Sequence, residues 1–134
     1  MRSKKDGKIY AMKVADCSRM SNEEIKEAEH ECTILAKVHS EYVCKYYDSF
    51  YKDQRLYIVM EFCEGGDLDL NAEENMIWRL FIEICLGLYR LHEFRILHRD
   101  IKSMNIFLGK DNKIKIGDLG LAKELNKTTS MAQT

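Results

Sequence analysis

The 134-residue sequence lacks several features that mark large classes of protein. It has five cysteines without a C-x-x-C pair and four histidines without an H-x-x-x-H pair, so we expect neither a disulfide framework nor a zinc site. Scattered cysteines are typical of buried thiols in a reducing compartment. No apolar run approaches membrane-spanning length, and the net charge of -1 argues against nucleic-acid and polybasic membrane partners. These absences favour a cytoplasmic chain of the size of one ordinary domain.

The most informative stretch covers residues 96–108, with the sequence I-L-H-R-D-I-K-S-M-N-I-F-L. Apolar runs flank a polar loop, as a catalytic loop requires, because anchored ends hold its side chains in place. After a G-K-D-N turn, K-I-K-I-G-D-L-G predicts a short strand that ends in an acid beside glycines. Asp100, Asn105 and Asp118 together supply the oxygen ligands and the base that a magnesium–phosphate site needs.

Both motifs resemble those of protein kinases: H-R-D-I-K-S-M-N is similar to the catalytic loop, and D-L-G to the magnesium-binding motif. The resemblance implies that Asp100 accepts or orients the substrate hydroxyl proton and that Lys102 neutralises the transferring phosphoryl group. It implies that Asn105 and Asp118 bind Mg²⁺ beside ATP. A lysine at position 102 resembles serine/threonine kinases, whose substrates are Ser or Thr hydroxyls of proteins. His98 is implied to be structural.

The N-terminal residues predict a hairpin and a strand. Lys5-Asp6-Gly7-Lys8 carries Asp-Gly, a two-residue hairpin signal, but few residues precede it, so we expect the chain to begin partway into a fold. The following Y-A-M-K-V resembles the third kinase strand, which makes Lys13 the phosphate-binding lysine. A surface lysine on a half-buried strand is the alternative for so short a motif.

A helix follows the first strand. S-N-E-E from Ser21 to Glu24 is a capping-box signature. By its place in H-E-C-T-I-L, Glu31 resembles the helix-C glutamate, which would pair with Lys13. The other acids of the helix are expected to form a solvated face. Its apolar stripe at helical spacing consists of Ile25, Ala28, Cys32 and Leu35.

Residues 42–50 and 56–62 predict two strands joined by the turn 52–54. The second, in L-Y-I-V-M-E-F-C-E-G-G-D-L, resembles the strand and hinge with which kinases hold adenine. The two strands can also form an antiparallel hairpin packed on one face, and the two interpretations are compatible. The positions implied to bind the nucleotide are Met60 as gatekeeper, the backbone of Glu61 and Cys63 at the adenine edge, and Asp67 at the ribose.

From Asn71 to Phe94 the pattern is helical, with Asn71 and Glu74 as a capping pair. This segment resembles kinase helix E, a buried C-lobe helix, whose apolar side would be covered by helices absent from this sequence. Its apolar residues recur at intervals of three and four positions, and they are Met76, Ile77, Leu80, Phe81, Ile84, Leu88 and Leu91.

The polar stretch after Lys123 resembles the start of an activation segment, although a polar chain end is often only a frayed terminus. No A-P-E follows, and the chain has no proline. The hydroxyl residues that could be phosphorylated are Thr128, Thr129, Ser130 and Thr134.

We therefore expect an α+β fold that is a partial two-lobed protein kinase: N-lobe strands three to five with helix C in residues 1–62, then helix E, the catalytic loop and the start of the activation segment in residues 63–134. V-M-E-F-C-E-G-G-D-L and I-C-L-G-L are similar to the NIMA-related kinases. The implied function is a serine/threonine kinase using ATP and Mg²⁺, with this chain a fragment.

The alternative is a non-catalytic kinase-like binding module or pseudokinase, against which the intact Lys13, Asp100 and Asn105 weigh. The implied partners are a protein substrate and a regulatory protein, with no nucleic acid and no membrane. The cytoplasm is the expected location, with the nucleus and the cytoskeleton as alternatives suggested by the family.

Overall fold

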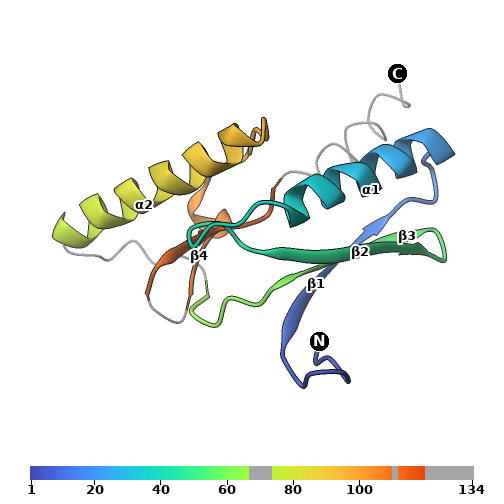
Figure 1. Cartoon of the computed structure of the whole chain (residues 1–134), viewed down its shortest axis with the longest axis horizontal. Helices are drawn as coiled ribbons and strands as arrows, with labels where there is room; N and C mark the ends of the chain where they lie inside the picture. Colours follow the sequence, from blue (N-terminus) through green and yellow to red (C-terminus); the bar gives the residue numbers. More distant parts are fainter. Residues whose placement is uncertain (67–73, 110–111, 120–134) are drawn as a thin grey trace. The chain divides into compact units, whose positions relative to one another are not determined.

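The computed structural model describes residues 1–66, 74–109 and 112–119 and has the expected α+β composition. Asp67, the Asn71 cap, and the hydroxyl residues Thr128, Thr129, Ser130 and Thr134 lie outside these residues. The elements are β1 (Tyr10–Asp16), α1 (Asn22–Ala36), β2 (Tyr46–Lys52), β3 (Arg55–Glu61), α2 (Glu74–Glu93), the 3₁₀ turn η1 (Ser103–Asn105), β4 (Ile106–Leu108) and β5 (Ile114–Ile116) (Figure 1).

The chain divides into two compact units, which we describe separately. The first contains Met1–Lys37 and Lys45–Phe62, and the second contains Val38–Cys44 and Cys63–Leu119.

The first unit is an antiparallel sheet in the order β1-β3-β2 with α1 packed on it (Figure 1). Lys13 lies directly opposite Ile58, so both side chains share one face of the sheet. Ile58 is 1% exposed, whereas Val14, on the other face, is 49% exposed. The face that carries Lys13 is therefore the one buried in the core.

Helix α1 begins as expected. The Ser21 hydroxyl accepts from the Glu24 N–H at 3.2 Å, and the Glu24 carboxylate accepts from the Ser21 N–H at 2.7 Å, so the predicted capping box is confirmed. The predicted stripe is also confirmed, because its four members are the buried residues of the helix: Ile25, Ala28, Cys32 and Leu35.

The strand predicted for residues 42–50 is shifted, since β2 begins at Tyr46 and continues to Lys52. The reason is a long-range pairing. Val43 forms a parallel bridge with Ile116, the Cys44 N–H donates to the Ile116 carbonyl at 2.8 Å, and the Ile116 N–H donates to the Tyr42 carbonyl at 2.9 Å. This segment therefore belongs to the second unit.

The N-terminal hairpin is present but has a wider turn than Asp-Gly predicts. Arg2 pairs with Ile9, and the Ser3 N–H donates to the Lys8 carbonyl at 2.8 Å, which leaves four residues in the turn. Gly7 takes the left-handed φ of 70°, whereas Asp6 uses its side chain to accept from the Lys8 N–H at 3.1 Å. A type I′ turn needs two positive φ values, so this turn is a different type.

In the second unit, α2 lies over the β4–β5 hairpin. Its buried line runs through Leu80, Glu83, Gly87 and Leu91. A Cβ atom at Gly87 would lie 2.7 Å from the Ile116 side chain and 2.9 Å from the Tyr42 carbonyl, so glycine permits this close approach. No helix in the described part of the chain is long and apolar enough to span a membrane.

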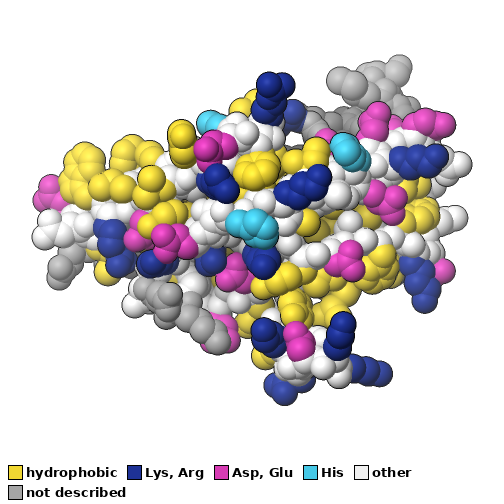
Figure 2. All heavy atoms as spheres, in the orientation of Figure 1, with side chains coloured by type: hydrophobic (Ala, Val, Ile, Leu, Met, Phe, Trp, Pro, Cys, Tyr) yellow, Lys and Arg dark blue, Asp and Glu magenta, His cyan; other side chains and the backbone are white. Residues whose placement is uncertain are grey.

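The opposite side of α2 carries apolar side chains that the second unit does not cover. Among the predicted apolar positions, Met76, Ile77 and Phe81 are 47–56% exposed, and Trp78 is 61% exposed. Figure 2 shows hydrophobic side chains gathered along this helix. The periodicity identified the helix, but part of its apolar set is exposed.

Candidate active site

The catalytic-loop motif is held at its C-terminal end by the β4–β5 hairpin. Ile106 pairs with Ile116, and both are at most 2% exposed. The η1 turn places Asn105 immediately before β4, and the Asn105 N–H donates to the Lys102 carbonyl at 2.9 Å. The apolar run after the polar loop thus does what the sequence predicted, which is to anchor the loop in a core.

Three of the predicted site residues lie in direct contact. The amide nitrogen of Asn105 donates to the Asp100 carbonyl at 2.8 Å and to the Asp100 Oδ2 at 3.1 Å. The Lys102 ammonium lies 3.2 Å from the same Oδ2. Asn105 is 4% exposed, so its side chain is held by the core while Asp100 remains partly accessible. Two donors converging on one oxygen orient the carboxylate.

His98 joins the loop to the segment before Asp118. It is 3% exposed, its Nδ1 accepts from the Asp100 N–H at 3.3 Å, and its Nε2 lies 2.8 Å from the Gly117 carbonyl. Since a backbone N–H only donates, Nδ1 is the acceptor and Nε2 carries the proton given to Gly117. The Gly117 N–H in turn donates to the Asn105 carbonyl at 3.0 Å. These bonds hold Gly117, the residue before Asp118, against His98 and Asn105.

Two residues beside this network have left-handed backbone conformations. Arg99 has a φ of 65° and Asp118 a φ of 52°. Such angles cost about 1–3 kcal/mol at a non-glycine residue and persist only where neighbouring contacts impose them. Here the hydrogen bonds of His98 and Gly117 supply those contacts. Strain of this kind is concentrated at functional sites.

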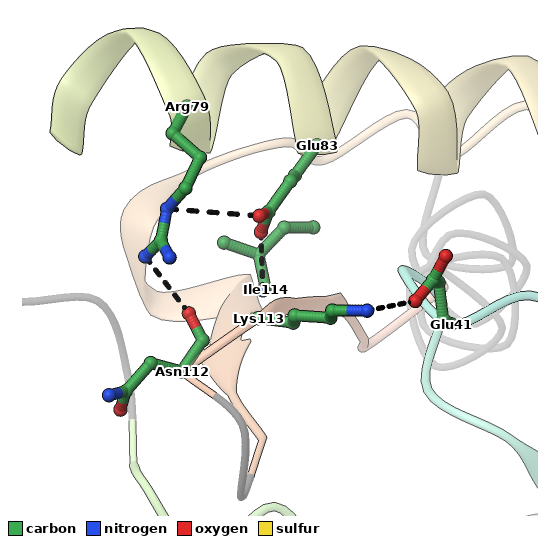
Figure 3. Close-up of polar contacts among 6 residues, drawn as sticks. All are labelled: Glu41, Arg79, Glu83, Asn112, Lys113 and Ile114. Atoms are coloured by element: carbon green, nitrogen blue, oxygen red, sulfur yellow. Dashed lines mark hydrogen bonds and ion pairs between the residues drawn. The ribbon is translucent and has the colours of Figure 1, made fainter. Parts of the chain in front are cut away.

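Glu83 supports the hairpin from α2, and the sequence analysis missed it. Figure 3 shows its carboxylate directed at the Ile114 backbone, whose N–H donates to it at 3.0 Å. Arg79 lies 3.8 Å from Glu83 and donates to the Asn112 carbonyl at 3.2 Å. Glu83 is 8% exposed. Its position on the same helical line as Leu80 and Leu91 could have indicated it, but a pattern of apolar residues does not include an acid.

The hinge segment also joins this unit. The Gly65 N–H donates to the Leu108 carbonyl at 3.0 Å, and the Leu108 N–H donates to the Gly66 carbonyl at 2.9 Å. Cys63, two residues earlier, is half-buried, and its sulfur lies 3.5 Å from that of Cys44. The segment that follows Cys63 is therefore hydrogen-bonded to β4.

The remaining nucleotide positions belong to the first unit. Lys13 is half-buried in β1, Glu31 is exposed on α1, and Met60 lies opposite Ala11 in β3. Glu61 ends β3, where its N–H donates to the Lys45 carbonyl at 2.7 Å.

The donor set suits a cation bound with phosphate. Within residues 1–66, 74–109 and 112–119, no three His, Cys, Asp or Glu side chains form a metal-binding group. Mg²⁺ does not require one, because it is held by one or two carboxylates together with phosphate oxygens and water. The Asp118 carboxylate and the Asn105 Oδ1 are oxygen donors of the type that Mg²⁺ prefers.

Comparison with known proteins identifies the family of the chain. Residues 1–134 match the protein kinase domain family. The chain is 43% identical over 142 residues to serine/threonine-protein kinase Nek1 of Mus musculus, covering 100% of the chain and 12% of that protein. It is 40% identical over 142 residues to Nek9 of Mus musculus, covering 99% and 14%, and 38% identical over 143 residues to Nek4 of Mus musculus, covering 100% and 18%.

The chain thus spans less than a fifth of each of these three relatives. The matches confirm the resemblance to the NIMA-related (Nek) serine/threonine kinases. This chain belongs to the protein kinase domain family.

Proposed function

We propose that this chain carries catalytic and nucleotide-binding parts of a serine/threonine protein kinase, which transfers the γ-phosphoryl group of ATP to a protein hydroxyl. The observation that carries the proposal is the contact of Asp100 with Lys102 and Asn105, at 2.8–3.2 Å, on a loop anchored in a core. Phosphoryl transfer depends on positioned charges more than on covalent chemistry, and this cluster positions an anion, a cation and an amide together.

In this proposal Asp100 accepts the proton of the substrate Ser or Thr hydroxyl. Lys102, 3.2 Å from Asp100 Oδ2, places a positive charge where the transferred phosphoryl group carries negative charge. Asn105 keeps the Asp100 carboxylate in one orientation through its two hydrogen bonds. Asp118 and Asn105 would hold Mg²⁺, which when bound neutralises phosphate charge.

The nucleotide-binding roles are assigned residue by residue. We propose that Lys13 binds the phosphates with Glu31 orienting its ammonium, and that the backbone of Glu61 and Cys63 bonds the adenine edge beside Met60. Asp67 would reach the ribose. Lys13 is half-buried on the inner face of the sheet, opposite Ile58, and this position supports its proposed role.

We further propose that the partners are Ser- or Thr-containing proteins and a regulatory protein. The proposed location is the cytoplasm, with the nucleus and the cytoskeleton as alternatives. The exposed apolar side chains on α2, such as Trp78 and Phe81, support contact with further protein, whether of the same polypeptide or of a partner.

The test is transfer of radiolabelled γ-phosphate from Mg-ATP to a generic protein substrate, followed by phosphoamino-acid analysis. We expect phosphoserine and phosphothreonine. Asp100→Asn should lower the transfer rate about 10²–10⁴-fold, the usual contribution of general-base catalysis, with nucleotide affinity nearly intact. Asp48→Asn, at an exposed carboxylate on β2, is the matched control and should change neither quantity.

The outcomes separate the two candidate functions. Transfer that persists in Asp100→Asn would show that Asp100 is not the base. ATP binding by the parent chain without any transfer would favour the alternative, a kinase-like binding module.

A further inference from the structure

Two cysteines far apart in the sequence lie in contact in the second unit. The sulfur atoms of Cys44 and Cys63 are 3.5 Å apart across 19 positions of sequence. A disulfide bond is about 2.05 Å long, so its formation requires the two sulfurs to approach by about 1.5 Å. No motif in the sequence indicates this pair, because its spacing matches no metal-binding or redox pattern.

Both cysteines are attached to backbone that is hydrogen-bonded to the same hairpin. The Cys44 N–H donates to the Ile116 carbonyl in β5 at 2.8 Å. Two residues after Cys63, the Gly65 N–H donates to the Leu108 carbonyl in β4 at 3.0 Å. These bonds therefore hold the backbone at or near both cysteines beside the same hairpin.

The two thiols differ in access. Cys44 is 3% exposed, whereas Cys63 is half-buried and reachable from solvent. A half-buried thiol beside a buried one has the arrangement of an attacking and a resolving cysteine.

The other cysteines are in less favourable settings. Burial raises the pKa of Cys32 to about 11 and also raises the pKa of Cys17, so neither is suited to make the first attack on glutathione disulfide. Cys85 is exposed on α2, where its thiol is accessible to glutathione disulfide.

We propose that Cys44 and Cys63 are a redox modification site that forms a reversible disulfide with a small-molecule disulfide, such as glutathione disulfide, as the oxidant. The Cys63 thiolate attacks one sulfur of glutathione disulfide and expels one glutathione thiolate, giving a mixed disulfide. Cys44 attacks the Cys63 sulfur and expels the second glutathione, and the Cys44 proton passes to the departing glutathione thiolate. Two protein thiols are oxidised, and one glutathione disulfide is reduced to two glutathione molecules.

This site does not depend on the proposed kinase activity. It depends on the sulfur contact and on the fold of the second unit, so the two proposals can fail independently.

The test uses the full 134-residue chain equilibrated in glutathione buffers of increasing oxidised fraction, then alkylated, digested with trypsin and analysed by mass spectrometry without reduction. Each cysteine lies in a different tryptic peptide, with Cys44 in residues 38–45 and Cys63 in residues 56–79. We expect these two peptides to be linked at a lower oxidised fraction than any other pair, and dithiothreitol to separate them.

Three variants assign the roles. In Cys44→Ala the reaction should stop at a Cys63–glutathione mixed disulfide, and in Cys63→Ala the Cys44 thiol should remain unmodified. Cys85→Ala is the matched control at an exposed site and should leave the link unchanged.

Measurement on the parent chain decides the proposal even if a variant does not fold. Accumulation of glutathione on Cys63 without the link would overturn it. The same would follow if the pair linked as readily in concentrated urea, since the preference would then come from sequence separation and not from the fold.

Discussion

The side-chain amide of Asn105 donates to two oxygens of Asp100, the backbone carbonyl at 2.8 Å and Oδ2 at 3.1 Å. An amide nitrogen carries two hydrogens, so this pair of bonds uses both of them and leaves Oδ1 as the atom of Asn105 that can ligate a cation. The proposed base and the proposed metal ligand are therefore oriented by each other, and a change in one side chain affects the other.

Asn105→Asp should destabilise the fold as well as the site. It replaces a donor with a second carboxylate about 3 Å from Asp100, and it leaves the Asp100 carbonyl without its donor. We expect the free energy of unfolding in urea to fall by about 1–3 kcal/mol, the usual cost of an unsatisfied polar group. Asn75→Asp, in the exposed first turn of α2, is the control and should not destabilise the chain, because a negative charge near a helix N-terminus is mildly favourable. Equal losses of unfolding free energy in Asn105→Asp and Asn75→Asp would show that the Asn105–Asp100 hydrogen bonds do not stabilise the fold.

Glu83 should contribute to stability through the hairpin it holds. In Glu83→Ala the buried Ile114 N–H loses its acceptor, so we expect a loss of about 1–3 kcal/mol in the free energy of unfolding. Glu83→Gln keeps a carbonyl oxygen and should recover most of that loss. The control is Glu93→Ala, which removes only a solvent-exposed ion pair with Arg90, of the kind worth about 0–1 kcal/mol. A Gln variant no better than the Ala variant would argue against the hydrogen bond.

Gly87→Ala should destabilise the chain although alanine favours helix by about 1 kcal/mol. The added Cβ would lie 2.7 Å from the Ile116 Cδ1 and 2.9 Å from the Tyr42 carbonyl. We expect a net loss of about 1–3 kcal/mol from overpacking, measured as a shift of the urea midpoint. Ile116→Val removes the Cδ1 atom, so the double variant should recover part of the loss. A gain in stability for Gly87→Ala alone would contradict the packing described here.

The ion pair of Lys113 with Glu41 should contribute stability only above acidic pH. The side-chain hydrogen bond from Lys113 lowers the pKa of Glu41 below its ordinary value of 4.5. A carboxyl whose pKa is lower in the folded than in the unfolded chain stabilises the fold above the unfolded pKa, and this contribution is lost as the pH falls through the folded pKa.

Thermal unfolding of the parent chain and Glu41→Gln should therefore differ at pH 7 and converge at acid pH, as the pH falls through the folded-state pKa of Glu41. Because both side chains are exposed, the difference should also shrink in high salt. A difference that stays the same at both pH values would show that Glu41 acts through something other than its charge.

The parts of the fold that were predicted correctly depend on residues close together in the sequence. The capping box joins Ser21 to a glutamate three residues later, and the α1 stripe recurs every three or four residues, so local geometry is sufficient to determine both. The catalytic-loop residues Asp100, Lys102 and Asn105 also lie within six positions, and their mutual contact follows from one tight turn.

The errors and omissions arise where distant segments meet. Tyr42–Cys44 were assigned to a strand by composition, but they pair with Ile116, which lies more than seventy positions later. Glu83 was not recognised because its partner, the Ile114 N–H, is 31 positions away and carries no sequence signal.

By itself the sequence determined the element types, the helix start at Ser21 and the chemistry of the loop around Asp100, since each is encoded by neighbouring side chains. Only the tertiary structure decided the neutral tautomer of His98, the support of β5 by Glu83 and the contact of Cys44 with Cys63. Those relationships depend on which backbone groups are paired across the hairpin, and backbone groups are the same in every residue, so no side-chain pattern specifies them.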